Sequence, residues 1–194
     1  FPSCRGRVIV APLGVDADMR PCGPEEIAAA RAALGVRPDR RYVLYVGTLQ
    51  PRKNLDRLVT AWSLVCDRWP EVDLVLAGRP GWGGHDPAAI ARRLGIERRV
   101  LLPGYVPRAM LPGAYSGAVA LAHPSLYEGF GLTVAEAMAC GTTVLASRAS
   151  SLPEVVGDAG LLFDPTDDHA IAECLRLAIE DEGLRRRLST AGRA

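Results

Sequence analysis

The chain has 194 residues, of which 48% are apolar, and a formal net charge of +1. One α/β domain with a full core fits this length and composition, and the near-neutral charge gives no broad electrostatic field for nucleic acid or a membrane surface. No apolar run approaches the ~20 residues of a membrane-spanning helix. The five cysteines have no metal-binding spacing, so we expect reduced thiols in a cytoplasmic protein.

Short apolar runs alternate with longer amphipathic patterns along the chain. After a strand candidate at 7–12, we expect strands at 42–47, 72–78, 99–104, 118–124, 142–147 and 159–165. Helical patterns follow them at 54–69, 86–95, 107–117, 131–139, 151–157 and 167–180. Continuous apolar strands are typical of strands buried on both faces. The sequence therefore predicts an α/β fold with a Rossmann-like parallel sheet and helices on both faces.

The two ends of the chain suggest a fragment. It begins at Phe1 without an initiator Met and stops inside a helical pattern at 185–194. We therefore interpret residues 1–194 as one domain excised from a longer protein, with a partner domain missing.

Ligands of open parallel sheets bind at the carboxyl ends of the strands, so the loops there hold the candidate residues. Arg52 and Lys53 lie in the loop after the strand at 42–47, just before a helix that Asn54 is expected to cap. Arg offers a planar fork and Lys a point charge, which together suit a diphosphate. A solvated surface pair is the open alternative.

The stretch "EGFGLT" supplies a second candidate anion site. Gly129 and Gly131 flank Phe130, and a helix is expected to start there. The amides of Gly131, Leu132 and Thr133 then have no intrahelical acceptor. Together with the helix dipole they form a phosphate site.

Two acids flank this helix start. Glu136 lies about one turn into the helix, where a carboxylate is suited to a ribose diol. Glu128 precedes the helix and falls on the far side of the phosphate site, where it is suited to hydroxyls of a sugar that the phosphate carries. The alternatives are an ordinary helical Glu at 136 and an acid at 128 that only favours the helix dipole.

Five segments, in order, carry a resemblance to a known family: "YVGTLQPRKNLDRLVTAW", "LVLAGRPGWGG", "VLLPGYVP", "HPSLYEGFGLTVAEAMACGTTVLAS" and "SLPEVVGDAGLLFDP". From about Val8 to Arg193 the chain resembles the C-terminal, donor-binding half of a GT-B retaining glycosyltransferase of group 1, also called family 4. Its Glu, seven residues, Glu motif is matched by Glu128 and Glu136.

The resemblance implies a role for each matched residue. The diphosphate of a nucleoside-diphosphate sugar would lie between Arg52, Lys53 and the helix amides, with the ribose at Glu136 and the sugar at Glu128. The remaining donor-binding residues that it implies are Gly47, Thr48, Arg79, Tyr105, Val106, Leu111 and Phe130, with Tyr105 and Val106 at the base edge and Leu111 packing nearby. Many relatives have "GR" where this chain has Gly47 and Thr48, which either leaves phosphate binding to Arg52 and Lys53 or calls for a different tilt of the donor. The "PRKN" variant resembles a subgroup that often uses GDP-mannose.

The implied reaction is transfer of a hexose to an acceptor hydroxyl with retention at the anomeric carbon, from a GDP- or UDP-linked donor and without a metal or other cofactor. Glu128 is the candidate catalytic residue, either as nucleophile or as sugar ligand. The acceptor, a glycan or a lipid-linked sugar, would bind the missing N-terminal domain, in the cytoplasm or at the inner face of the membrane. The fragment alone is expected to be inactive. Two rivals are a nucleotide-sugar epimerase of the same fold and a non-catalytic nucleotide-sugar-binding module.

The remaining motifs of the sequence favour structural roles. Asp16 and Asp18 spell DxD, which we interpret as turn residues rather than metal ligands. His85, His123 and His169 have no ligand-like spacing, and His123 is expected to be packed or to face the donor. The run Arg185–Arg187 predicts a solvated helix face, with an anionic membrane as the alternative contact.

Overall fold

The computed structural model describes residues 13–83 and 86–193, so the strand expected at 7–12 and the side chain of His85 lie outside the described residues. Six parallel strands form one sheet in the order β3-β2-β1-β4-β5-β6. Their bounds are β1 Arg41–Val46, β2 Val72–Ala77, β3 Val100–Gly104, β4 Ala120–His123, β5 Val144–Ser147 and β6 Gly160–Phe163. The predicted Rossmann-like sheet is confirmed, with strand ends shifted by one or two residues.

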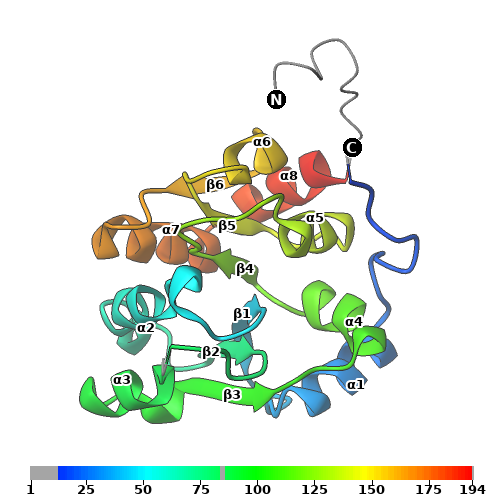
Figure 1. Ribbon diagram of the computed structural model, residues 1–194. Coiled ribbons are helices and arrows are strands. Elements are labelled where there is room, and N and C mark those ends of the chain that lie inside the picture. The colour runs from blue at the N-terminus through cyan, green and yellow to red at the C-terminus, as the bar shows by residue number, and fades with distance from the viewer. Residues whose placement is uncertain (1–12, 84–85, 194) are drawn as a thin grey trace, which may run out of the picture.

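Helices cover both faces of this sheet (Figure 1). One face carries α2 (Leu55–Ser63), α3 (Pro87–Arg93) and α7 (Asp168–Glu180). The other face carries α1 (Pro24–Ala33), α4 (Leu111–Ser116), α5 (Leu132–Ala139) and α6 (Leu152–Val156), while α8 (Glu182–Gly192) packs against α7 and α5. Each face has its own apolar cluster, because strands that are apolar on both faces bury both.

The helix expected at 54–69 is shorter than its pattern. The α-helix ends at Ser63, where Leu64 N–H bonds Ala61 O in a tighter turn, and a 3-10 turn follows at Cys66–Arg68. Trp69 precedes Pro70, and a residue before proline is disfavoured in the α region. The amphipathic pattern continues through the turn, which is why the sequence predicts one long helix.

Helix α1 has no counterpart among the elements predicted from the sequence. It begins with Pro24 at the first helical position, followed by Glu25 and Glu26, and Glu26 accepts a bond from Gly23 N–H. Proline and acids at a helix start are the signal that marks it. No helix among the described residues is long and apolar enough to cross a membrane.

Candidate functional site

The strand order reverses between β1 and β4, and the polar candidates meet there. The chain runs outward from β1 to β2 and β3, then returns to place β4 on the other side of β1. In this 3-2-1-4-5-6 order, ligands bind at the reversal, beyond the carboxyl ends of the strands. Arg52 and Lys53 follow β1 in a 3-10 turn, Pro51–Lys53, and Glu128 follows β4. The fold thus brings the predicted cation pair to the first predicted acid.

Glu128 is the centre of a buried ionic network, which we call the Glu128 network and define as Arg52, Lys53, His123, Ser125 and Glu128. The Lys53 ammonium donates to Glu128 Oε1, and Arg52 Nη1 donates to Glu128 Oε2 at 3.0 Å. His123 Nε2 lies 2.9 Å from Glu128 Oε1 and 3.2 Å from Ser125 Oγ. Both carboxylate oxygens are therefore engaged, and the Glu128 and Lys53 side chains are each only 10% exposed.

The protonation states of this network follow from its contacts. Burial acts to raise the pKa of Glu128, but hydrogen bonds from His123, Lys53 and Ser125 outweigh burial and hold that pKa well below its usual range. Burial lowers the pKa of His123, and the hydrogen bond to Glu128 only partly opposes it. A neutral His123 that donates from Nε2 leaves Nδ1 as a bare acceptor, in agreement with the lack of a partner for Nδ1 among the described residues.

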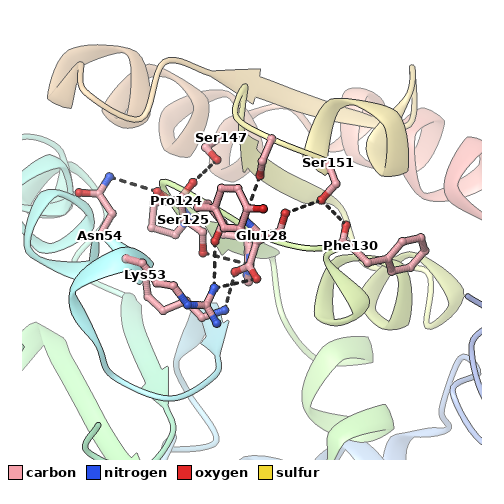
Figure 2. Close-up of polar contacts among 12 residues, drawn as sticks. Lys53, Asn54, Pro124, Ser125, Glu128, Phe130, Ser147 and Ser151 are labelled. Atoms are coloured by element: carbon pink, nitrogen blue, oxygen red, sulfur yellow. Dashed lines mark hydrogen bonds and ion pairs between the residues drawn. The ribbon is translucent and has the colours of Figure 1, made fainter. Parts of the chain in front are cut away.

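Serine side chains hold the Glu128 loop from the neighbouring β5–α6 connection (Figure 2). Glu128 N–H donates to Ser150 Oγ at 2.8 Å. Ser151 Oγ lies 3.0 Å from the Glu128 carbonyl oxygen and 2.9 Å from that of Phe130. The Phe130 ring turns away from the Glu128 carboxylate. These contacts fix the position of the carboxylate through its backbone.

The prediction that Asn54 caps α2 with its side chain is wrong. Asn54 has left-handed backbone angles, φ 58 and ψ 33, and makes no side-chain capping bond, because a capping side chain needs an extended backbone at that position. Its Nδ2 instead donates to the carbonyl oxygens of Pro124 and Pro165, at 3.1 and 2.8 Å. Asn54 therefore ties the exit of β1 to the exit of β4, as Figure 2 shows, and also to the exit of β6.

Helix α5 begins where the sequence places it, with Gly131 at the N-cap. Gly131 has φ 101, and a Cβ there would come 2.7 Å from Leu152 Cδ2, so glycine is required at this turn. Within residues 13–83 and 86–193, the amides of Gly131, Leu132 and Thr133 donate to no acceptor. Leu132 is exposed. The helix therefore presents three free N–H groups at its positive end.

Glu136 lies one turn into α5 and is buried. Its Oε2 accepts a hydrogen bond from the Tyr115 hydroxyl at 3.0 Å, and its Oε1 faces Arg108 Nη1 at 3.4 Å. Arg108 also bonds Asp16 and, at 3.5 Å, Asp18. The DxD pair therefore contacts Arg108, and the described residues include no group of three or more metal-ligand side chains.

A cavity of about 470 Å³ opens at the carboxyl ends of β1, β2 and β3, within the size range of small-molecule sites. Its lining includes six predicted donor-binding residues: Gly47, Thr48, Arg79, Tyr105, Val106 and Leu111. Val46, Ala77, Gly78 and Arg108 complete the lining. Because Arg108 also contacts Glu136, it connects this cavity to helix α5.

Sequence reasoning missed Arg108 and Tyr115, which contact Glu136 from the β3–α4 connection and from α4. Nothing in the local pattern around them predicts a partner in α5. The run Arg185–Arg187 is only partly solvated: Arg185 Nη1 donates to the carbonyl oxygens of Ala178 and Ile179, at 2.7 and 3.0 Å, at the end of α7. The other two arginines are exposed, as predicted.

A doubly wound parallel sheet in the order 3-2-1-4-5-6, with polar residues at the strand-order reversal, is the architecture found in Rossmann-like α/β domains. The family model described as "Glycosyl transferases group 1" matches residues 26–194. The chain belongs to this family, and its fold is a Rossmann-like half of a GT-B enzyme.

Relatives and solved structures agree with this assignment. The chain is 36% identical to O-antigen chain mannosyltransferase B of Escherichia coli, over 97% of this chain and 49% of that protein. Anabaena HepE, solved with UDP and glucose, has a TM-score of 0.82 at 27% identity, over 93% of this chain and 49% of that one. The C-terminal domain of LpcC from Francisella tularensis shares the fold, with a TM-score of 0.80 at 23% identity, over 93% and 95% of the two chains. The chain spans about half the length of the mannosyltransferase.

Proposed function

We propose that residues 1–194 form the donor-binding half of a retaining hexosyltransferase, which transfers a hexose from a nucleoside diphosphate to an acceptor hydroxyl. One observation carries this proposal: a cavity, a buried acid beside it, a helix N-terminus with free amides and a cation pair share the carboxyl edge of one sheet. The cavity suits the base, the buried acid Glu136 suits the ribose, and the helix N-terminus and the cation pair together suit the diphosphate. Glu128, which contacts the cation pair, then suits the sugar.

The layout gives each part of the donor a partner. The base enters the cavity at Tyr105 and Val106, and the ribose hydroxyls donate to Glu136. The diphosphate accepts from the free amides of α5 and from Arg52 and Lys53, whose N–H groups now bond Glu128. When the donor binds, some of the bonds from Arg52 and Lys53 to the Glu128 carboxylate are therefore replaced by bonds to the diphosphate. The HepE structure with UDP and glucose supports a donor of this chemical class.

Catalysis in this proposal is electrostatic. As the bond between the anomeric carbon and the diphosphate breaks, Arg52, Lys53 and the α5 amides stabilise the departing charge. Glu128 has both oxygens engaged and a depressed pKa, which makes its carboxylate a weak nucleophile. We therefore assign Glu128 to the donor sugar and the cation pair rather than to a covalent intermediate. The acceptor hydroxyl then attacks the anomeric carbon from the face of departure and passes its proton to an oxygen of the departing diphosphate, which accounts for retention.

The whole protein supplies the rest of the proposed reaction. We place the acceptor, a glycan or lipid-linked sugar, on an N-terminal domain outside this chain, and the enzyme in the cytoplasm with peripheral contact to the inner face of the membrane. The test is product analysis of the full-length protein with nucleoside-diphosphate hexoses. A glycosylated acceptor with the donor's anomeric configuration supports the proposal. An epimerised donor, an inverted product or an unchanged donor contradicts it.

An experiment on residues 1–194 alone tests whether donor binding and acceptor binding belong to separate domains. The chain is expected to bind a nucleoside diphosphate in calorimetry and to transfer no sugar to an added acceptor, because the proposal places the acceptor on a domain outside this chain. Steady transfer by this chain would contradict the two-domain part of the proposal.

A further inference from the structure

The backbone at Arg79 is held rigidly between two strand exits. Arg79 O accepts from Leu49 N–H at 2.9 Å, and Gly81 N–H donates back to Leu49 O at 2.8 Å. The preceding Gly78 lies so close to β1 that an added Cβ would come 1.8 Å from Gly47 O. The exits of β1 and β2 therefore behave as one unit, and the Cα of Arg79 has a fixed place at the rim of the cavity.

The side chain of Arg79, in contrast, has its donors free. Within the described part of the chain, its guanidinium makes no hydrogen bond and no ion pair. Its one recorded contact is with the ring of Tyr105, whose centroid lies 4.4 Å from the guanidinium carbon. Stacking on an aromatic ring orients the guanidinium plane without using its N–H groups. The guanidinium of Arg79 is thus oriented by Tyr105 and offers its N–H donors to a ligand in the cavity.

The remaining side chains of the cavity supply few acceptors. Val46, Ala77, Val106 and Leu111 are apolar, Arg108 is a second donor, and Thr48 and Tyr105 carry hydroxyls. Among residues 13–83 and 86–193, no carboxylate or carboxamide side chain lines it. The side chains of this cavity therefore complement a ligand that combines apolar surface with an edge of hydrogen-bond acceptors.

We propose that Arg79 is a specificity residue that selects guanine, so that the donor is a GDP-linked sugar; this inference rests on the proposed function. Guanine presents two adjacent acceptors, O6 and N7, which fit the fork of an arginine bidentately. Adenine places an amino donor beside N7, which meets the guanidinium with like polarity. Uracil carries no second acceptor adjacent to O4, so it offers the fork a single bond. Tyr105 holds the guanidinium in position for this pairing.

Titration calorimetry of the 194-residue chain with GDP, UDP, ADP, IDP and 7-deaza-GDP tests the inference. GDP is expected to bind on the order of ten- to a hundredfold more tightly than UDP or ADP. IDP keeps O6 and N7 and is expected to match GDP within about threefold, whereas 7-deaza-GDP, which lacks the N7 acceptor, loses most of the preference. This pair of analogues separates recognition of the O6/N7 edge from recognition of the guanine amino group.

Variants assign the effect to one residue. Arg79→Ala is expected to remove most of the preference for GDP over UDP, because GDP loses two bonds to the fork and UDP loses only one. Arg79→Lys, which keeps the charge but not the fork, is expected to behave like Arg79→Ala. The matched control is Arg98→Ala, an exposed arginine in the turn that precedes β3 and so at the opposite sheet edge. It is expected to change neither affinity.

The outcomes separate this inference from the proposed function. A chain that binds UDP or ADP as tightly as GDP overturns the role of Arg79 and leaves the donor-binding proposal intact. A guanine preference that survives in Arg79→Ala has the same consequence. A chain that binds none of the nucleoside diphosphates overturns both.

Discussion

Lys53 and Arg79 follow neighbouring strands of the sheet, yet their surroundings are opposite. Lys53 is buried against the carboxylate of Glu128, in a network that also engages Arg52 and His123. Arg79 is exposed, and among the residues that the structure describes its guanidinium contacts only the ring of Tyr105. In the first region, around Lys53, a ligand must compete with the Glu128 carboxylate for the cations. In the second region, around Arg79, a ligand binds donors that are not already used. The first region is therefore expected to affect stability strongly, and the second to affect ligand selection.

The largest effect is expected from breaking the Glu128 network. Glu128→Ala leaves the buried Lys53 ammonium and the His123 imidazole without their carboxylate, and removing one partner of a buried ion pair costs roughly 3–5 kcal/mol of the free energy of unfolding. Urea denaturation with linear extrapolation measures it. The control is Glu182→Ala, which removes an exposed pair with Arg186 and should cost less than about 1 kcal/mol. Equal losses of unfolding free energy in the two variants would show that water reaches the Glu128 network.

Glu136 lies between the two regions, because it belongs to α5 and contacts the cavity residue Arg108. Its substitution tests whether the ribose binds there. Glu136→Ala is expected to weaken the nucleoside and the nucleoside diphosphate equally, by roughly ten- to a hundredfold, which corresponds to 1.5–3 kcal/mol for a charged hydrogen-bonding group. Calorimetry measures both ligands. Tyr115→Phe serves as the control for orientation, since it removes only the hydroxyl bond to Glu136, and its loss should be smaller. Unchanged nucleoside affinity in Glu136→Ala would remove the ribose from this site.

Lowering the pH should reduce the free energy of unfolding through His123, a member of the Glu128 network. Because burial lowers the pKa of His123 in the folded chain, the unfolded chain takes up a proton as pH falls below about 6.5 while the folded chain does not. The free energy of unfolding therefore decreases as pH falls from 6.5 towards 5, by at most about 1.4 kcal/mol per pH unit from this residue. Glu128, whose pKa is also depressed, adds to the loss below about pH 4.5.

Urea denaturation between pH 5 and 7.5 measures this dependence. His123→Gln should show a shallower slope than the unaltered chain, whereas His169→Gln, at an exposed position in α7, should keep the slope. Comparison of slopes rather than absolute stabilities separates titration from packing losses. Identical slopes in all three proteins would mean that His123 titrates alike in the folded and unfolded chains.

The smallest effect is expected from chelation. Arg52, Lys53 and the α5 amides supply the positive charge for a diphosphate in the proposed site, and Asp16 and Asp18 are engaged with Arg108. EDTA should therefore leave donor binding unchanged in calorimetry. Binding that collapses with EDTA and returns with Mn²⁺ would assign a metal to Asp16 and Asp18.

The fold was largely predictable because its signals are local. Each of the six described strands is a short apolar run, and a run that is apolar on both faces identifies a parallel sheet. The helix start at Gly131 was predictable for the same reason, since glycine and free amides are features of one short segment. The prediction for Asn54 failed because a capping side chain depends on backbone angles that the sequence does not fix.

The sequence by itself determined which residues carry charge and which turns they follow. Only the tertiary structure decided their partners: Lys53 meets Glu128 across 75 positions, and Arg108 meets Asp16 across 92. These pairs depend on the strand order, which the packing of helices on both faces sets and which no local pattern encodes. The same is true of Arg79, whose contact with Tyr105 exists because β2 and β3 lie side by side. Side chains from separate loops become neighbours only when the strands that carry them do.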